Sequence, residues 1–455
     1  MARWLEAADR FWAQAVDLAW GLPLVILLIC SGIYFTFFCR FVPFRRIPHA
    51  IRVLRGTYDN PNDPGEITHF QALSSALAAT IGMGNIAGVA IAVTVGGPGA
   101  VFWMWIAGLV GMATKFFECT LSCMYRKEDS RGIVQGGPMY WIEIALGPRW
   151  RFLGVLFSLF GMLGCLALFQ VNQLASLLHA DYAIPRAITG AAATSFVAVV
   201  VLGGIVRVGR VTARVVPFMA ILYVVAALVI LAQHLTAIPA VLESIFTGAF
   251  QGTAAVGGVA GVTVREALIT GVRRAAFSNE AGMGTAPMAH GAARTSEPVR
   301  EGLVAMLGPF IDTNIVCSLT AFVILATGVT GTDDGVLLTA SAFEQGIPYV
   351  GRFVLTVVIL LFSTSTMISY SYYGTKCAKY LLGETRGARY VYVYLLTMFL
   401  GALWSQDMVI NMLDTAFALM AVPTLTSTLA LSPRVLHASR GYFRRMAAQP
   451  SRTEH

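Results

Sequence analysis

The chain has 455 residues, of which 56% are hydrophobic and only 12% are Asp, Glu, Lys or Arg. A soluble domain carries about 25% charged residues, so this composition excludes an ordinary soluble globular protein. The net charge of +8 resides in short segments between apolar stretches. These basic residues are therefore topology signals, and a nucleic-acid partner is excluded.

Apolar stretches of about 20 residues, each long enough to cross a bilayer as a helix, recur along nearly the whole chain. They predict an all-α polytopic membrane protein with a leading helix and ten core helices, eleven in all. A Gly-rich stretch at 240–262 separates core helices 1–5 from core helices 6–10. The predicted helices cover 21–39, 68–96, 99–123, 152–178, 185–204, 211–234, 265–290, 301–328, 350–374, 390–404 and 408–431.

The distribution of basic residues predicts the orientation of these helices. If the segment 40–66 is cytoplasmic, every second connection is cytoplasmic as well, and the inside segments hold 24 of the 32 Lys and Arg residues. Cytoplasmic loops are enriched in Lys and Arg, so we expect the N-terminus outside and the C-terminus inside. The N-terminal residues lack the features of a cleaved secretory signal, and we expect them to be retained.

The same Gly-Met-Gly sequence interrupts the first helix of each half. Core helix 1 contains it at Gly82–Gly84 and core helix 6 contains it at Gly282–Gly284. Five helices per half is an odd number, so the halves face opposite ways across the membrane, as in the inverted repeats of secondary transporters. Each glycine costs about 1 kcal/mol relative to Ala in a helix, so we expect both helices to be broken at mid-membrane.

A broken helix within a membrane indicates a ligand, because unpaired backbone groups are tolerated there only inside protein or beside a cavity. The N-terminal end of a half-helix suits a carboxylate, and freed carbonyls suit an ammonium group or Na⁺. A zwitterionic amino acid requires both. The alternative is that these glycines only allow two helices to cross closely.

Core helix 8 carries four consecutive hydroxyl residues, Ser363–Thr366, in the middle of an apolar span. Hydroxyl oxygens are hard ligands that suit a small hard cation. Such a run also often bonds back to the preceding helical turn, and this alternative stays open.

Several other polar or aromatic residues lie in or beside the predicted spans. Glu280 is an acid within the membrane, either a proton carrier or a fixed anchor for the broken backbone. Arg273 and Arg274 lie about one turn outside the break, where they form a gate salt bridge or extend to the interface. Phe277 directly precedes the break and either caps a substrate or packs in the core.

For the remaining polar residues the structural interpretation is at least as strong as a functional one. Gln170 and Asn172 either face a central site or form interhelical hydrogen bonds. We expect the others near span ends, in solvated cavities or at the interface; they are Asp312, Asp407, Asp414, His69 and His290.

At several of these residues the sequence resembles the alanine or glycine:cation symporter family, also called the sodium:alanine symporter family. The resemblance runs from about Gly56 to Ser432. Its most specific segments are Gly82–Ala90, Gly96–Trp105, Gly111–Phe116, Gly137–Glu143, Phe277–His290 and Ser371–Gly374.

The resemblance implies the leucine-transporter type of fold, a 5+5 inverted repeat of the amino acid–polyamine–cation type with one extra N-terminal helix. The implied regions are an N-terminal segment at 1–66, repeats at 67–236 and 237–432, and a basic cytoplasmic tail at 433–455. The implied activity is import of alanine or glycine with Na⁺ by alternating access in the bacterial plasma membrane. H⁺ is the alternative ion, no organic cofactor is expected, and protein partners are not predicted.

The resemblance also implies roles for individual residues. Substrate would be bound by the amides around Thr80, Gly82 and Gly84, with a pocket formed by Asn85, Gln170, Phe277, Ser278, Met367 and Trp404. Na⁺ would be held by the carbonyls of Ala78, Ile81 and Phe362 and the hydroxyls of Ser365 and Thr366. Coupling or gating would involve Glu280, Arg273 and Arg274.

The sequence departs from the family pattern at Met83, Tyr370, Thr375 and Thr424, where Thr, Trp, Glu and Asn are usual. These positions affect the substrate more than the fold, so a larger neutral amino acid such as glutamine remains an alternative cargo. A membrane-embedded enzyme is disfavoured because no catalytic motif lies at a plausible depth. A passive channel also remains an alternative function. We expect the basic tail, with Arg434, Arg440, Arg444 and Arg445, to contact anionic lipid headgroups.

Overall fold

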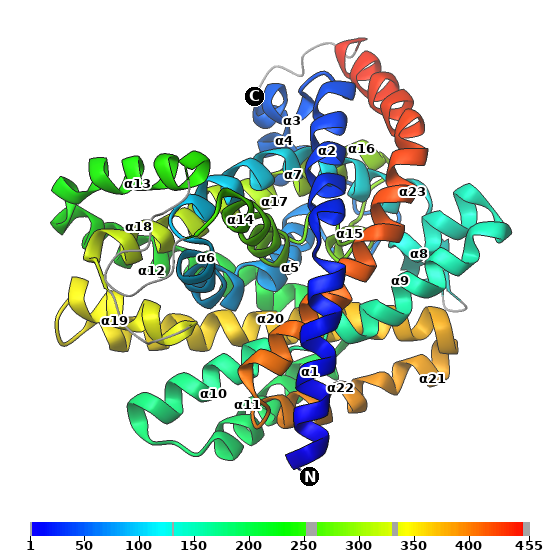
Figure 1. The fold of residues 1–455 in the computed structure, drawn as a ribbon. Coiled ribbons are helices and arrows are strands. Elements are labelled where there is room, and N and C mark those ends of the chain that lie inside the picture. Colours follow the sequence, from blue (N-terminus) through cyan, green and yellow to red (C-terminus); the bar gives the residue numbers. More distant parts are fainter. Residues whose placement is uncertain (1, 130–131, 252–261, 330–334, 449–455) are drawn as a thin grey trace.

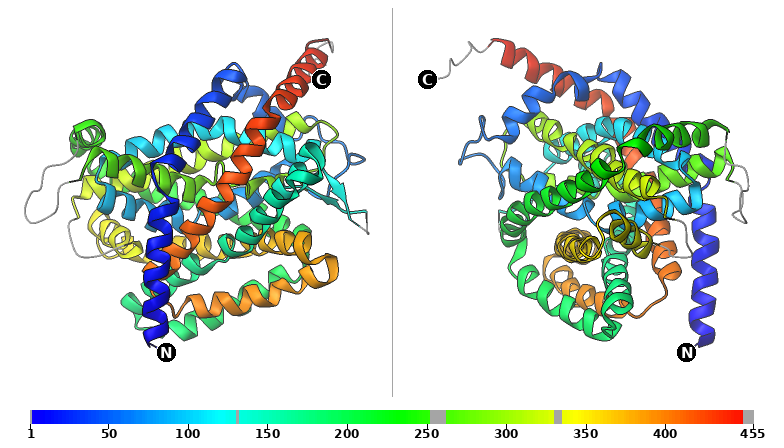
Figure 2. Two further views of the ribbon diagram at one scale, coloured as in Figure 1. Left: turned by 45° about the vertical axis from the view of Figure 1, so that its right-hand side comes forward. Right: turned by 90° about the vertical axis from the view of Figure 1, so that its left-hand side faces the viewer.

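The computed structural model describes residues 2–129, 132–251, 262–329 and 335–448, and these parts of the chain are almost entirely helical. Figure 1 shows the helices gathered into one bundle, with the start of α1 and the end of α23 at opposite ends. The turned views in Figure 2 show the same separation of the two ends.

The first half of the chain contains twelve α-helices, short π- and 3₁₀-turns and one two-stranded antiparallel hairpin. Its elements are α1 Ala2–Ala19, α2 Leu22–Phe38, α3 Val42–Arg45, α4 Ile47–Leu54, α5 His69–Thr80, η1 Gly84–Gly88, α6 Val89–Gly96, α7 Gly99–Met124, β1 Lys127–Glu128, β2 Val134–Gln135, α8 Pro138–Trp141, η2 Ile142–Leu146, η3 Pro148–Trp150, α9 Arg151–Gly164, α10 Leu168–Tyr182, α11 Arg186–Val201 and α12 Gly204–Gln233.

The second half is helical throughout the residues that the structure describes. Its elements are η4 Leu235–Ala237, α13 Ile238–Gln251, α14 Val264–Asn279, α15 Ala286–His290, α16 Pro298–Ala305, α17 Leu307–Pro309, η5 Phe310–Cys317, α18 Ser318–Thr327, α19 Val336–Gly346, α20 Gly351–Leu382, α21 Glu384–Ala388, α22 Tyr390–Gly401 and α23 Gln406–Ala448.

The predicted multi-pass character agrees with these helices. Within the described ranges, six helical stretches are long and apolar enough to cross a membrane, and two bent pairs raise the number to eight. Shorter apolar helices such as α11 and α13 accompany them. The count of eleven and the inverted repeat remain predictions.

Two predicted boundaries are wrong, and one further helix was not predicted. The leading helix α2 is preceded by a further helix, α1, at an angle of 47°, which the charged residues of the N-terminus conceal in the sequence. The stretch predicted as Gly-rich connection at 240–262 begins with α13; its part at 252–261 lies outside the described residues. The helix predicted to end at 431 continues through Pro433 to Ala448, so much of the basic tail belongs to α23.

Three long helices form the frame around the two broken ones. α7 packs against α14, α16 and α2, while α20 packs against α5, α9 and α12. α23 packs against α1 and α9 and extends along one side of the bundle (Figure 1). These contacts place α5 and α14 inside the bundle, where their irregular backbone is shielded from lipid.

Candidate functional site

The first break interrupts the helix predicted over 68–96. α5 begins at a capping box, in which the side chains of Thr68 and Gln71 accept hydrogen bonds from each other's main-chain amides, and it ends at Thr80. Ile81 turns the chain into extended backbone, and η1 then leads into α6, so that the two halves meet at 51°. The predicted break is confirmed.

Four of the five predicted Na⁺ ligands converge at this break. The Oγ1 of Thr366 on α20 lies 3.0 Å from the carbonyl oxygen of Ala78 and 3.1 Å from that of Phe362. The Oγ of Ser365 lies 2.9 Å from the Phe362 carbonyl and 3.4 Å from that of Ala78. A Cβ at Gly82 would lie 2.4 Å from Thr366 Oγ1, so only glycine fits this close approach. Two carbonyls and two hydroxyls therefore form a compact set of hard oxygen donors.

The hydroxyl residues Ser363–Thr366 of α20 include one that bonds back to its own helix and two that also reach the first break. Ser363 donates to the Ile359 carbonyl over 2.6 Å, so this hydroxyl bonds back within its own helix. Ser365 and Thr366 also reach across to α5. Ile81, the fifth predicted ligand, is fully buried at the C-cap of α5.

The second break interrupts the helix predicted over 265–290. α14 ends at Asn279, and Glu280 then adopts left-handed backbone with φ of 55°. Gly282 and Gly284 follow with φ of 89° and 78°, values that L side chains rarely adopt, before α15 begins. This predicted break is also confirmed.

Hydroxyl groups on two elements hold the carboxylate of Glu280, which is completely buried. Tyr370 Oη on α20 donates to one oxygen, and Thr285 Oγ1 in the break donates to the other. Both carboxylate oxygens are therefore bonded to groups around the break, and the choice between an anchor and a proton carrier remains a prediction. Sequence reasoning did not single out Lys115 and Glu118, which are buried nearby on α7.

Asp312 joins the two breaks. The Nδ2 of Asn85, in the first break, donates to Asp312 Oδ1 over 2.8 Å, and Ser278 Oγ, beside the second break, donates to Asp312 Oδ2 over 2.6 Å. The Oδ1 of Asn85 also accepts from the Gly82 amide at 2.8 Å. The interpretation of Asp312 as a solvated or span-end residue is wrong, because its side chain is fully buried in η5. Its place near the middle of the predicted span is the signal that points to it.

Aromatic side chains cover the first break. Phe277 makes edge-to-face contacts with Phe169 and Phe417, with ring centroids 5.3 Å and 5.5 Å apart. A Cβ at Gly84 would lie 3.4 Å from Phe277 Cδ1 and 3.3 Å from the Cα of Ser278. The predicted pocket residues Phe277, Ser278 and Gly84 are therefore direct neighbours.

The other predicted pocket residues differ in their surroundings. Gln170 is buried, and within the described residues its Oε1 has no hydrogen-bond partner. Met367 is fully buried on α20. Trp404 lies in the connection between α22 and α23, where its main-chain oxygen accepts from Asn172 Nδ2 over 2.9 Å. Asn172 also donates to the Gly401 carbonyl, so it makes the interhelical bonds that the sequence offered as an alternative.

An ion pair lies over the aromatic cluster. Arg273 Nε donates to Asp414 Oδ2 over 2.7 Å, and Arg274 Nη2 donates to the same oxygen. The guanidinium of Arg274 lies 5.2 Å from the ring centroid of Phe277. Of the two predicted arrangements, the structure shows the salt bridge. The expectation that Asp414 is solvated is wrong, because its side chain is fully buried.

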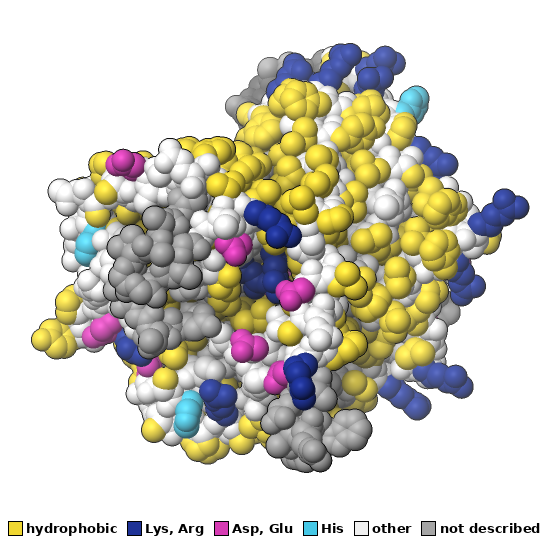
Figure 3. Space-filling view, viewed as in Figure 1, with side chains coloured by type: hydrophobic (Ala, Val, Ile, Leu, Met, Phe, Trp, Pro, Cys, Tyr) yellow, Lys and Arg dark blue, Asp and Glu magenta, His cyan; other side chains and the backbone are white. Residues whose placement is uncertain are grey.

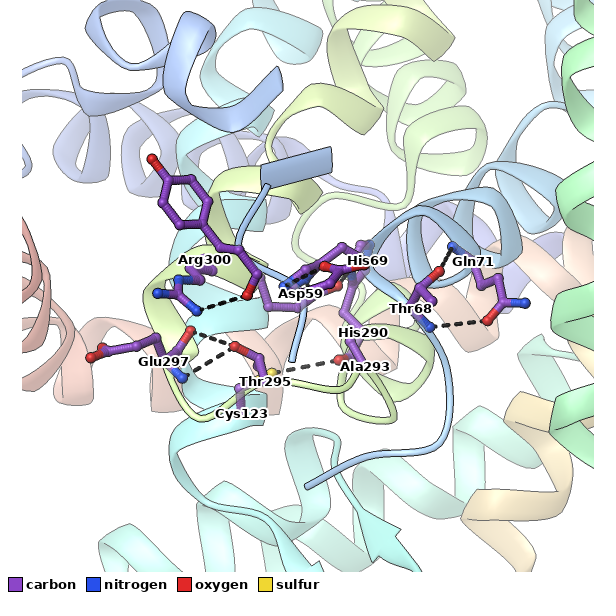
Figure 4. Close-up of polar contacts among 12 residues, drawn as sticks. Asp59, Thr68, His69, Gln71, Cys123, His290, Ala293, Thr295, Glu297 and Arg300 are labelled. Atoms are coloured by element: carbon purple, nitrogen blue, oxygen red, sulfur yellow. Dashed lines mark hydrogen bonds and ion pairs between the residues drawn. The ribbon is translucent and has the colours of Figure 1, made fainter. Parts of the chain in front are cut away.

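A second polar cluster connects the other ends of the broken helices. His290, the last residue of α15, bonds through Nδ1 to Glu301 Oε1 at 2.5 Å, and His69, the first residue of α5, bonds through Nδ1 to Glu301 Oε2. Figure 4 shows His69 and His290 close together, with Asp59 beside His69. The interpretation of the two histidines as ordinary interfacial residues is wrong, because both are 1% exposed.

Main-chain bonds reinforce this cluster. Ile67, just before α5, forms a parallel bridge with Ala293, just after α15, and Arg294 N donates to the Ile67 carbonyl over 2.7 Å. Arg126 adds a bond to the Ala293 carbonyl at 2.6 Å. The chain entering the first broken helix and the chain leaving the second are thus held together.

The ion pair at Asp414 and the histidine cluster at Glu301 lie far apart along α23. Asp414 is near the start of this helix, whereas Arg445, near its end, pairs with Glu297 close to the histidine cluster. This separation corresponds to at most about 47 Å of helix.

Comparison with known proteins places this arrangement in a family. Residues 5–455 match the sodium:alanine symporter family. The sodium/alanine symporter AgcS of Methanococcus maripaludis is 40% identical, covering 93% of this chain and 94% of its own. The probable sodium/glutamine symporter GlnT of Bacillus subtilis is 34% identical, covering 95% and 90%.

The fold has a counterpart among solved structures. The crystal structure of MhsT in complex with L-phenylalanine superposes with a TM-score of 0.59 at 13% identity, covering 81% of this chain and 89% of MhsT. This likeness supports the leucine-transporter type of fold. Because the family match extends over nearly the whole chain, and the relatives are similar over most of their own lengths, the chain belongs to the sodium:alanine symporter family, a family of transporters and not of enzymes.

Proposed function

We propose that this protein imports alanine or glycine together with Na⁺ by alternating access. Membership of the family supports sodium-coupled symport of an amino acid, and the choice of a small neutral one rests on the resemblance and on the geometry of the breaks. The observation that carries the proposal is the convergence of the Ala78 carbonyl of α5 with the Ser365 and Thr366 hydroxyls of α20 at the first break.

Na⁺ would bind between α5 and α20. The ion would replace the hydrogen bonds that Ser365 and Thr366 now make to the Ala78 and Phe362 carbonyls, with Ile81 as a further ligand. Its binding would fix the backbone around Gly82 in one shape. Because the substrate would use the same backbone, each ligand would raise the affinity for the other.

The amino acid would bind beside the first break. Its carboxylate would be received by the amides around Thr80, Gly82 and Gly84, in competition with Asn85, which now accepts from the Gly82 amide. Gln170, with its unpartnered buried oxygen, is a candidate acceptor for the ammonium group. The close contact between Gly84 and the Phe277 ring favours a small side chain.

Alternating access would open the two closures in turn. The Arg273 and Arg274 pair with Asp414, above Phe277, would act as the outer gate. The bonds of His69 and His290 to Glu301 would close the inner side. This assignment agrees with the proposed bacterial plasma membrane location and with the N-terminus outside and the C-terminus in the cytoplasm.

The test is uptake of labelled alanine into liposomes that carry the purified protein, with an imposed Na⁺ gradient. We expect accumulation that requires Na⁺ and is blocked by excess unlabelled glycine. Thr366→Val removes one proposed Na⁺ ligand at nearly constant volume. Loss of one bond to a charged group costs about 2 kcal/mol, which corresponds to a roughly 30-fold increase in half-saturating Na⁺.

Ser363→Ala is the matched control, because among the described residues this hydroxyl bonds only to the preceding turn of its own helix, and we expect the Na⁺ dependence of the variant to be unchanged. Equal Na⁺ dependence of the unmodified protein, Thr366→Val and Ser363→Ala would refute the ion site. Uptake that is independent of Na⁺ but driven by a pH gradient would favour proton coupling. Glu280→Gln would then test whether Glu280 carries the proton. Preference for glutamine over alanine would indicate the cargo named for the GlnT relative.

A further inference from the structure

An arginine-rich cavity lies where the segment after α2 meets the end of α23. Its volume is about 340 Å³. Its lining combines apolar residues, among them Val42, Leu436 and Phe443, with arginines from both ends of the chain. These arginines are Arg40, Arg45, Arg46, Arg440 and Arg444.

Within the described residues, no acidic side chain compensates the positive charge of this cavity. Among the described residues, no carboxylate forms an ion pair with any of the five arginines, whereas the neighbouring Arg445 pairs with Glu297 and Arg434 bonds to the Tyr125 hydroxyl. Arg46 stacks on the Phe443 ring with Cζ 4.4 Å from the centroid, which holds its guanidinium at the cavity. Five like charges around one cavity repel one another, and a bound phosphate would remove this cost through charge-assisted hydrogen bonds.

The cavity lies at the edge of the apolar surface. Phe37, Phe41 and Phe44, on the same segment as Arg40 and Arg45, are 64%, 41% and 39% exposed. In Figure 3, dark blue basic side chains gather at the upper end of the face, above a mostly yellow surface; α3 and the end of α23 lie at this upper end in Figure 1. A ligand here would have its charged group among the arginines and its apolar part beside the aromatic rings.

We propose that this cavity binds the headgroup of an anionic phospholipid, with the phosphodiester among the five arginines and the acyl chains along the exposed aromatic side chains of α2 and α3. Free phosphate would use the same arginines but gain nothing from the apolar lining residues and the exposed rings. The bound lipid would connect the first helices to the end of α23. The proposal does not depend on which amino acid or ion is transported.

The test measures lipid binding to the full chain after purification in detergent and removal of bound lipid. Native mass spectrometry and thermal unfolding would be followed during titration with phosphatidylglycerol, with phosphatidylcholine of the same acyl chains, and with inorganic phosphate. We expect phosphatidylglycerol to bind and to raise the unfolding temperature, with much weaker effects of the other two.

Two non-overlapping double variants test the arginines, Arg45→Gln with Arg440→Gln and Arg40→Gln with Arg444→Gln. Each pair should weaken phosphatidylglycerol binding about tenfold or more, since each basic residue near a membrane surface contributes several-fold. Arg386→Gln with Arg389→Gln is the matched control, because both residues are exposed elsewhere and the charge change is the same.

Loss of binding in the two cavity variants but not in the control supports the proposal. If one cavity variant does not fold, the other decides. The proposal is overturned if a folded cavity variant binds as tightly as the original chain, if the control weakens binding equally, or if phosphatidylcholine or inorganic phosphate binds as well as phosphatidylglycerol.

Discussion

Replacement of Asp414 by Asn tests whether the buried ion pair holds the outer closure. In the structure, Asp414 Oδ2 accepts from both Arg273 and Arg274, while Arg274 is 2% exposed and lies over the Phe277 ring. Asn keeps the size of the side chain but removes its charge. The variant therefore leaves a buried guanidinium without its counter-ion as long as the closure is intact.

The expected effect follows from the burial of Arg274. Removal of one partner from a buried ion pair costs about 3–5 kcal/mol, because the remaining charge stays desolvated. If opening exposes Arg274 to water, this cost falls on the closed state alone. The equilibrium should then shift toward the outward-open state by a factor on the order of 10²–10⁴. Arg273 is 20% exposed, so Arg273→Gln should shift it much less.

A cysteine beneath the ion pair would report this opening. Phe417, 1% exposed and packed edge-to-face on Phe277, would be replaced by Cys after Cys30, the exposed native cysteine, is replaced by Ser. The rate of labelling by a membrane-impermeant thiol reagent would be measured with and without Asp414→Asn. We expect faster labelling in the Asp414 variant and slower net uptake of amino acid.

Asp407→Asn is the control, because it removes an acid that is exposed on the same helix. If Asp414→Asn yields a monodisperse protein that labels at the unmodified rate, the ion pair does not hold the closure. The same conclusion would follow if Asp407→Asn accelerated labelling as much.

Three further predictions follow from other parts of the structure. Gly82→Ala places a carbon 2.4 Å from the adjacent threonine hydroxyl of α20, so half-saturating Na⁺ in uptake should rise at least about tenfold, whereas Gly308→Ala, in open space, should change little. Glu301→Gln weakens the bonds to both histidines, so Cys123, which is buried beside them, should be alkylated faster. An unchanged rate of alkylation would contradict the role of Glu301 in the inner closure. Burial is the largest cause that lowers the pKa of His49 to about 4, and nearby arginines lower it further. The folded protein therefore resists a proton that the unfolded chain takes up near pH 6.5. The unfolding temperature of the protein should fall as the pH is lowered from about 6.5 to 4, and His49→Gln should reduce this decrease.

Much of the candidate site could be predicted from the sequence because its signals are local. Gly-Met-Gly in two otherwise apolar helices predicts both breaks, since glycine weakens a helix wherever it lies. The hydroxyl run at Ser363–Thr366 stands out against its apolar surroundings, and the structure brings Ser365 and Thr366 to the first break. The ion-binding role itself remains a prediction.

Sequence reasoning misjudged Asp312 and Asp414 and did not consider Glu301, and all three have partners on other helices. Asp312, Asp414 and Glu301 lie in or beside apolar spans, and an acid there can be solvated or buried with equal plausibility. The structure buries all three against partners that lie at different distances along the chain: Asp312 bonds to Asn85, and Asp414 pairs with Arg274. A single sequence does not show which helix faces which, so these pairs could not be predicted.

The sequence by itself determined the class of the protein, the approximate position of most helices and the two points where helices break, because composition and glycine act over a few residues. Only the tertiary structure decided what the breaks face. Packing of α20 against α5 brings hydroxyls to the first break, η5 connects the two breaks through Asp312, and the far ends of α5 and α15 meet at Glu301. These contacts depend on how separate helices pack, which local sequence does not encode.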